Sequence, residues 1–179
     1  MNRTLPGLWL VFLLPVFGAR AQDVKPTEYQ LKAAFIYHFA QFVNWPPRAF
    51  PDATSPFVIA VLGENPFGPS LAQATQGKNL NEHPLVVKEL RSLTEATNHL
   101  QILFISSSET RRLPEIFAAL RDSNVLTIGE TDRFLESGGM INFVREGTKI
   151  RFQINEEAAK NAGLKISSKL LSLATRKTQ

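Results

Sequence analysis

The residue types that could carry out catalysis occur in this sequence without the partners that a reaction would need. The segment 63–68 has the glycine spacing of a phosphate-binding loop, but Pro69 follows where that loop needs its lysine. The serines at 106–108 follow an apolar run, and capping of the next helix explains them more simply than a nucleophile does. No Gly-x-Ser-x-Gly motif and no pair of histidines at metal-ligand spacing occurs. The sequence therefore predicts a protein that is not an enzyme, without a catalytic residue, a metal site or a cofactor.

A polar set near the C-terminus has the chemistry of a ligand site. Arg151 lies on the polar face of an expected strand, and Lys165, Ser167 and Ser168 follow around the expected start of a helix. Basic side chains and the free N–H groups of a helix start bind anionic groups through charge-assisted hydrogen bonds. The pattern predicts that these four residues bind a small anionic or zwitterionic ligand. A solvated strand face at the end of a generally basic chain is the alternative, and the pattern leaves it open.

Aromatic residues are dense in the segment 29–45, at Tyr29, Phe35, Tyr37, Phe39, Phe42 and Trp45. A helix that packs into a core accounts for most of this set, because the apolar positions recur at helical spacing. Any aromatic ring left outside the core could instead contact a protein partner. Such a surface needs an apolar anchor within a polar rim. We therefore expect Tyr37 to be part of a surface that binds a partner protein.

Composition excludes several classes of protein. The 20 Lys and Arg residues against 16 Asp and Glu residues give a formal charge of +4, too small and too evenly spread for a dedicated nucleic-acid binder. Cysteine is absent, which excludes disulfides, thiolate metal sites, a cysteine nucleophile and haem attachment through cysteine. The apolar fraction of 44% and the charged fraction of 20% are those of a folded globular protein.

The first residues have the layout of a secretory signal peptide. Arg3 precedes an apolar run at 5–17, and Ala19-Arg20-Ala21 forms a small-x-small cleavage site. The apolar run is shorter than the ~20 residues that a membrane-spanning helix needs. We expect cleavage after Ala21, which leaves residues 22–179 as a single domain.

Elements of two kinds alternate along that chain, and these must position the candidate residues. Continuous apolar runs predict buried strands at 57–62, 85–87, 100–105 and 125–128. Helical spacing predicts helices at about 26–43, 70–74, 108–120, 132–136, 156–162 and 167–174. Alternating polarity predicts an antiparallel hairpin at 141–144 and 149–155. The expected fold is an α/β three-layer sandwich with a mostly parallel sheet and a C-terminal antiparallel hairpin.

Short motifs in the order of the chain resemble those of one known family. The segment 28–37 (Glu-Tyr-Gln-Leu-Lys-Ala-Ala-Phe-Ile-Tyr) and Trp45-Pro46 resemble the opening of the YfiR/HmsC family. The resemblance continues at 56–63, 103–106 and Gly138-Gly139-Met140-Ile141-Asn142-Phe143, and it ends with Arg151-Phe152 and 158–171. It covers nearly all of the mature chain.

The resemblance implies a periplasmic, non-enzymatic regulator with an α/β fold. Members of the family bind the periplasmic sensor domain of an inner-membrane diguanylate cyclase and repress it, which lowers cyclic-di-GMP signalling and biofilm formation. The resemblance also implies a ligand role for Lys165 and a partner role for the strand with Arg151. We expect Arg151 and Gln153 of that strand to bind the partner protein together with Tyr37. Cysteine pairs that serve redox sensing in the family are absent here, so another signal must release the partner. A periplasmic small-ligand-binding protein that serves a transporter or sensor kinase is the alternative, and a homodimer is one option for the oligomeric state.

Overall fold

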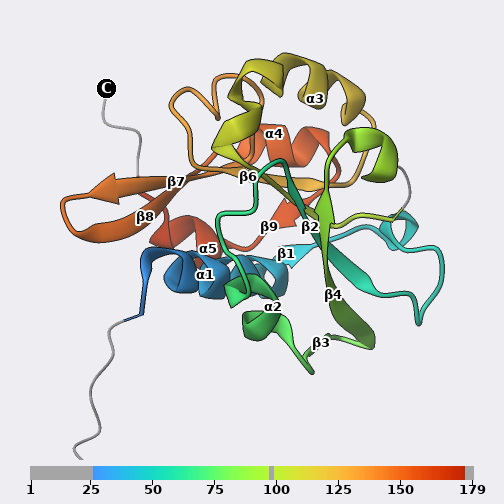
Figure 1. Cartoon of the computed structure of the whole chain (residues 1–179). Helices are drawn as coiled ribbons and strands as arrows, with labels where there is room; N and C mark the ends of the chain where they lie inside the picture. The colour runs from blue at the N-terminus through green and yellow to red at the C-terminus, as the bar shows by residue number, and fades with distance from the viewer. Residues whose placement is uncertain (1–25, 97–98, 176–179) are drawn as a thin grey trace, which may run out of the picture.

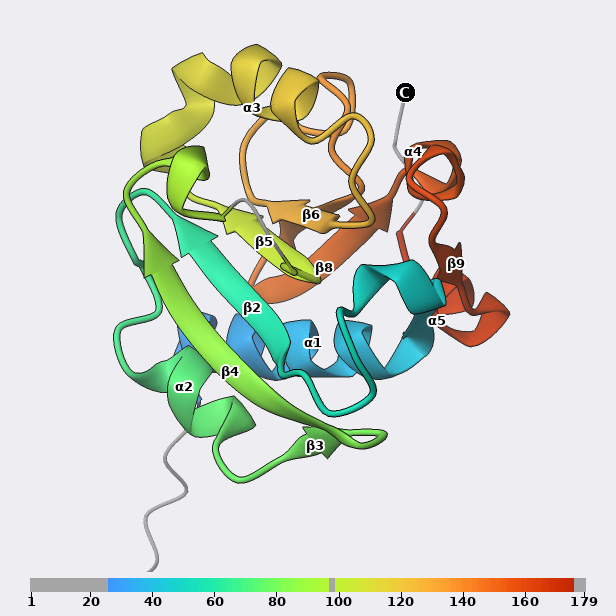
Figure 2. The same cartoon turned by 90° about the vertical axis from the view of Figure 1, so that its right-hand side faces the viewer.

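The computed structural model describes residues 26–96 and 99–175, and it has the expected α/β architecture. A mixed sheet of seven strands forms its centre, in the order β3-β4-β2-β5-β6-β7-β8 (Figures 1 and 2). These strands are β2 (Phe57–Leu62), β3 (Asn79–Leu80), β4 (His83–Leu90), β5 (Ile102–Ile105), β6 (Leu126–Gly129), β7 (Ile141–Glu146) and β8 (Lys149–Ile154). A separate antiparallel pair consists of β1 (Val43–Asn44) and β9 (Lys165–Ile166).

The sheet is mostly parallel. Strands β4, β2, β5, β6 and β7 pair in parallel with their neighbours, whereas β3 and β8 add antiparallel edges. The β7–β8 hairpin pairs Ile141 with Ile154 at its base and Glu146 with Lys149 at its tip. The predicted parallel sheet and the predicted C-terminal hairpin are both confirmed.

Helices cover both faces of the sheet, which completes the three layers. They are α1 (Glu28–Phe42), α2 (Ser70–Thr75), α3 (Leu113–Ala119), α4 (Glu156–Asn161) and α5 (Ser168–Leu173), with short 3₁₀ turns at Pro47–Ala49, Leu93–Ala96 and Ser107–Arg112. Residues from α1, α2 and α5 pack on one face, and residues from α3 pack on the other (Figure 1). Ser106 caps the turn that precedes α3, as the sequence predicted.

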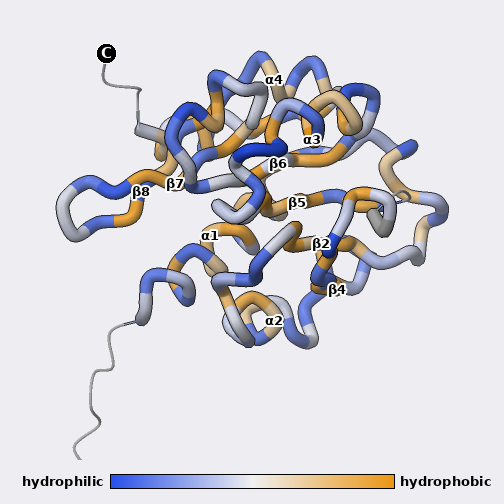
Figure 3. The backbone as a smooth tube through the Cα atoms, turned by 45° about the horizontal axis from the view of Figure 1, so that its top comes forward, coloured by the Kyte–Doolittle hydropathy of each residue, from blue (hydrophilic) through white to orange (hydrophobic). Residues whose placement is uncertain are grey.

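The apolar residues of β2 divide between two cores. Phe57, Ile59 and Val61 face α1, whereas the alternate residues of the strand face α3. All six residues of β2 are buried, because helices cover both sides of the sheet. The central strands accordingly show as the most hydrophobic part of the chain in Figure 3.

Helix α1 begins with a capping box. The Thr27 side chain accepts a hydrogen bond from the Gln30 N–H, and the Gln30 side chain accepts one from the Thr27 N–H at 2.7 Å. Pro26 therefore lies before the cap and not in the first turn, where the sequence had placed it. The helix ends at Phe42 as the chain becomes extended towards Trp45-Pro46.

Two local expectations differ from the structure, and three short strands were not expected. Residues 132–138 form consecutive turns and not a helix, because the ring of Phe134 is held between Gly129 and Gly139. The two-residue strands β1, β3 and β9 are too short to leave a polarity pattern. Strand β4 continues well beyond the apolar run that predicted it. The expected signal peptide lies outside the described residues.

Candidate functional site

The β7–β8 hairpin carries two of the three predicted partner-binding residues. Arg151 and Gln153 are on the same face of β8, opposite Val144 and Asn142 of β7. Arg151 is exposed, and its Nε lies 3.5 Å from the Glu146 carboxylate. Gln153 is half-buried, nearer the base of the hairpin. The two side chains are therefore on one surface, and Arg151 is the more accessible of them.

The base of the hairpin is anchored and its tip is not. Phe152 packs edge-on against Phe39 of α1, with ring centroids 4.9 Å apart, and Phe35 packs against the same ring at 5.6 Å. Towards the tip, residues 145–149 are exposed. Figures 1 and 3 show this end of the hairpin projecting beyond the helices, with hydrophilic residues at its turn. The hairpin thus presents a charged surface on a fixed support.

Tyr37 is the third predicted partner residue, and it lies on the side of α1 away from Phe39. It is half-buried; its hydroxyl accepts a hydrogen bond from Gln41 Nε2 at 3.1 Å, and Lys78 Nζ lies 3.9 Å from its ring centroid. The other aromatic residues of this segment all pack against the core. The core explanation is therefore correct for those residues, and Tyr37 alone of this set is not among the core residues. Among the described residues, the hydrogen bonds and ring contacts of Tyr37 involve Gln41, His38 and Lys78 and none of the hairpin residues.

Three of the four predicted ligand residues lie together around β9 and the start of α5, whereas Arg151 lies on β8. Lys165 is exposed in β9, where it pairs with Asn44 of β1. The Ser167 hydroxyl accepts a hydrogen bond from the Leu170 N–H at 3.2 Å, so it serves as the cap of α5, and Ser168 is exposed in the first turn. Among the described residues no hydrogen bond or ion pair joins Arg151 to this group, and its guanidinium lies against Glu146.

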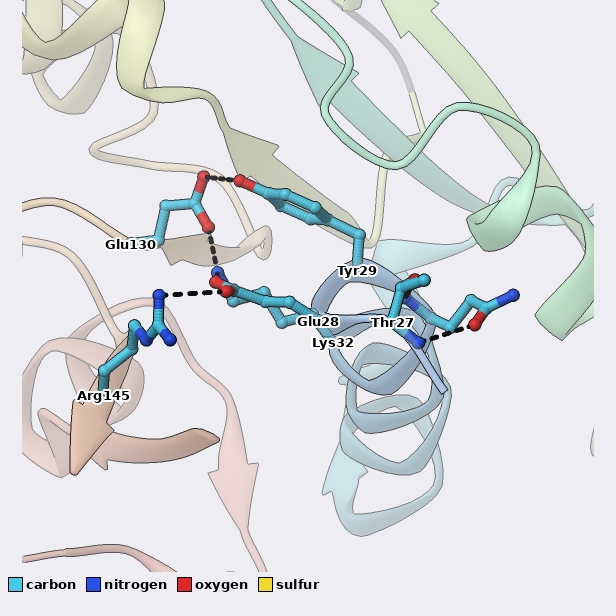
Figure 4. A network of polar contacts seen from close by, with 7 residues as sticks. Thr27, Glu28, Tyr29, Lys32, Glu130 and Arg145 are labelled. Atoms are coloured by element: carbon cyan, nitrogen blue, oxygen red, sulfur yellow. Dashed lines mark hydrogen bonds and ion pairs between the residues drawn. The ribbon is translucent and has the colours of Figure 1, made fainter. Parts of the chain in front are cut away.

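A buried ion-pair network lies at the start of α1, and sequence reasoning missed it. Lys32 is only 4% exposed, and its Nζ lies 2.5 Å from both the Glu28 and the Glu130 carboxylates. The Tyr29 hydroxyl donates to the other Glu130 oxygen at 3.1 Å (Figure 4). Arg145 of β7 completes the network with a guanidinium 3.5 Å from Glu28. The network joins α1 to the loop after β6 and to the hairpin.

These contacts shift the acidity of three groups. The hydrogen bond from Lys32 lowers the pKa of Glu28, and the positive charges of Lys32 and Arg145 act in the same direction. Burial alone would lower the pKa of Lys32, but its hydrogen bonds to Glu130 and Glu28 outweigh burial and raise that pKa. Burial, followed by the Glu130 charge, raises the pKa of Tyr29. The network therefore keeps Lys32 and Glu28 charged and Tyr29 neutral near pH 7.

One signal in the sequence could have located half of this network. Glu28 and Lys32 have the i,i+4 spacing of a helical ion pair, although Lys32 is buried beside the rings of Tyr29 and Phe143. Glu130 immediately follows the end of β6, but nothing local links it to residues 98 positions earlier in the chain.

The usual ligand position of an open α/β sheet is filled with side chains here. Ligands of such sheets bind beyond the carboxyl ends of two strands whose connections leave in opposite directions, which in this chain are β2 and β5. Ser108 Oγ accepts from the Glu64 N–H at 3.0 Å, and Ser108 and Glu109 take up the space beside Gly63. The described residues contain no cluster of three or more His, Asp or Glu residues that could hold a metal ion.

A groove with a volume of about 470 Å³ lies elsewhere, between the end of α3 and the turn at Pro47–Ala49. Its polar lining includes Arg48, whose Nε donates to Asn124 Oδ1 at 3.0 Å. None of the predicted ligand or partner residues lines this groove.

In the described ranges, no helix combines the length and the apolar character needed to cross a bilayer.

Comparison with known proteins identifies relatives of this architecture. The family model described as YfiR/HmsC-like matches residues 29–175. A crystal structure of a conserved domain protein from Vibrio cholerae O1 biovar El Tor is similar in fold, with a TM-score of 0.52 at 12% identity. The match covers 83% of this chain but only 59% of that one. No curated protein matches the sequence.

Proposed function

Because the chain belongs to the YfiR/HmsC-like family, we propose that it is a periplasmic regulator that binds a membrane diguanylate cyclase and represses it. Its target in this proposal is the periplasmic sensor domain of the cyclase. Repression of that domain lowers cyclic-di-GMP signalling and biofilm formation. The match over residues 29–175 is the observation that carries the proposal, because it spans both α1 and the hairpin.

The physical scheme is a shift in the population of two states of the cyclase. A regulator silences the enzyme only if it binds the inactive sensor conformation more tightly than the active one. Moving the cyclase from mostly active to almost wholly inactive needs a difference in binding of about 10⁴-fold, or ~5.5 kcal/mol. The anchored hairpin supports this scheme, because a fixed surface loses little conformational entropy when it binds.

The experiment that tests this proposal is a capture from membranes. Mature protein carrying an affinity tag is mixed with solubilised inner membranes of the source cells, and bound proteins are identified by mass spectrometry. We expect a diguanylate cyclase with a periplasmic domain, and we expect the Arg151→Glu variant to lose it. Lys88→Glu on β4 is the matched control, because it reverses an exposed charge near the opposite edge of the sheet. Equal recovery of the cyclase by all three proteins would exclude the hairpin as the contact, and no cyclase in any of them would contradict the proposal.

A small anionic or zwitterionic ligand at Lys165 is a second element of the proposal. The exposed ammonium of Lys165 supports it, whereas Ser167 is already engaged as a helix cap. Such a ligand would supply the releasing signal that a chain without cysteine needs. Calorimetric titration of wild type and Lys165→Ala with amino acids and organic phosphates tests this element. Binding by wild type and at least tenfold weaker binding by the variant is expected, and equal affinities would remove Lys165 from the site.

A further inference from the structure

Strand β8 is an edge of the central sheet, so one side of its backbone is not used by β7. Peptide groups of an antiparallel strand point alternately to the two sides. The Asn155 N–H bonds to Met140 on the β7 side, and the Phe152 carbonyl bonds to the Thr175 N–H on the other. The N–H and C=O of Ile150 therefore point outwards with those of Phe152, whereas those of Arg151 and Gln153 point to β7.

Three backbone groups of this outer edge are open within the part of the chain that the structure describes. They are the N–H and the C=O of Ile150 and the N–H of Phe152, and none of them has a hydrogen-bond partner there. The Phe152 carbonyl accepts from Thr175 at 2.8 Å, which shows that an added segment can bond at this edge. Towards the tip, the edge is uncovered in Figure 1. Unpaired edges of this kind accept an incoming strand.

The side chains of the edge define what can pair with it. On the face of β8 that points away from α1, Lys149 and Arg151 are both exposed, and Glu146 is the acidic neighbour of Arg151. On the other face, Ile150 and Phe152 belong to the core beneath the hairpin. A strand added here would place its alternate residues opposite two basic side chains and two apolar ones.

We propose that β8 binds an extended segment of the partner protein by strand addition, and that this segment alternates acidic with apolar residues. The identity of the partner rests on the proposed function, but the binding mode rests on the open edge and its charge. A second copy of this chain fits less well. Antiparallel pairing of two β8 strands through Ile150 would set Arg151 against Arg151 or Lys149 of the other copy, and like charges directly opposite each other are destabilising.

Amide hydrogen exchange with a peptide probe tests the binding mode without the cyclase. Two short peptides are added to the mature protein up to millimolar concentration. One alternates valine with glutamate (the glutamate peptide), and the other has lysine in place of each glutamate (the lysine peptide). The glutamate peptide should slow exchange at the Ile150 and Phe152 amides by about tenfold or more, as a buried hydrogen bond does. The Arg151 and Gln153 amides, already bonded to β7, are the internal control and should not change. No slowing at Ile150 and Phe152, or equal slowing by both peptides, would overturn the proposal.

A substitution that removes one outward N–H of β8 tests the same binding mode. Ile150→Pro removes an outward N–H without removing a bond to β7, and proline is tolerated at such edge positions. We expect it to bind the glutamate peptide roughly threefold to tenfold more weakly, as loss of one hydrogen bond implies, and Ile150→Val to bind normally. If Ile150→Pro does not fold, Arg151→Glu replaces it, with the lysine peptide expected to bind better than the glutamate peptide.

The two proposals fail in different ways. A folded Ile150→Pro variant that loses the peptide yet still represses the cyclase would refute strand addition as the contact and leave the regulator intact. Peptide binding at β8 by a protein that represses no cyclase would refute the proposed function alone. Protection of the Ile150 and Phe152 amides that rises with protein concentration in the absence of peptide would show that a second copy is the occupant, which would overturn the proposal.

Discussion

Lys32 is the residue at which the N-terminal helix meets the C-terminal hairpin. Its ammonium group is buried between Glu28 and Glu130, and Glu28 in turn contacts Arg145 of β7. A buried charge is stable only while its partners remain, because desolvation costs several kcal/mol per ion. The orientation of the hairpin relative to α1 therefore depends in part on this one side chain.

Removal of one partner of the buried pair should be far more costly than removal of both. Lys32→Met leaves Glu130, whose side chain is 10% exposed, without its counter-charge, and we expect a loss of about 3–5 kcal/mol in the free energy of unfolding. Lys32→Met combined with Glu130→Gln should recover most of that loss. Urea unfolding of the wild type, both single variants and the double variant measures the coupling. Additive effects of the two substitutions would show that the pair contributes no coupling energy.

The same network predicts how stability depends on pH. The pKa of Glu28 is lowered in the folded protein from its ordinary value near 4.5, so its contribution is present above that value and is lost as the pH falls below it. The pKa of Lys32 is raised from 10.5, so its contribution is lost as the pH rises above that value. Glu28→Gln should therefore unfold with a weaker dependence on pH below about 4.5 than wild type does. Identical acid profiles of the two proteins, measured by thermal unfolding across pH, would contradict this.

At the scale of the elements, the turns at 130–139 depend on two glycines that enclose one ring. A Cβ atom at Gly139 would lie 2.2 Å from the Phe134 ring, and one at Gly129 would lie 2.4 Å from it. The Phe134 ring is fully buried against α3, at 5.5 Å from Phe117. This packing fixes the start of β7, and so the base of the hairpin.

Gly139→Ala should destabilise the protein by at least ~1–3 kcal/mol, the usual cost of an overpacked core. Phe134→Leu in the same chain should relieve part of that cost, so the two substitutions should not be additive. Gly77→Ala is the control, because no atom lies within 4 Å of a Cβ there and only its positive φ of 67° is strained. Thermal unfolding of Gly139→Ala, Phe134→Leu, the double variant and Gly77→Ala measures these differences. A Gly139→Ala protein as stable as wild type would show that the Phe134 ring can move away.

The elements differ in how far the sequence could predict them. The long helix α1 and the buried strand β2 were predictable, because their periodicity is local and strong. The pairing of Val43 with Ile166 was not, because two-residue strands are fixed only by contacts between distant segments. The turn at Phe134 was misassigned to a helix for a similar reason, since the ring that determines it packs between glycines before and after it.

The residues of the candidate site also differ in how far the sequence could predict them. Arg151 and Gln153 could be placed together because alternation along one strand puts them on one face. The Lys32–Glu130 pair could not be found, because it joins two residues 98 positions apart. The open backbone groups of β8 also could not be found, since they depend on which strand ends the sheet.

At the scale of the whole molecule, the proposed binding surface and its support lie in two different parts of the structure. The sheet and its two cores hold the base of the hairpin, and the buried network joins that hairpin to α1. The tip and the β8 edge stay exposed. A regulator that acts by binding needs this combination, because a surface held in one geometry can favour one conformation of its partner over another.

The concentration of cyclic-di-GMP in cells tests the central claim most directly. Cells that lack this protein should contain several-fold more cyclic-di-GMP than wild-type cells, and a plasmid copy should restore the lower concentration. A copy with Arg151→Glu, exported and folded to the same level, should fail to restore it, because the charge at the proposed contact is reversed. An unchanged cyclic-di-GMP concentration in cells without the protein would contradict the account.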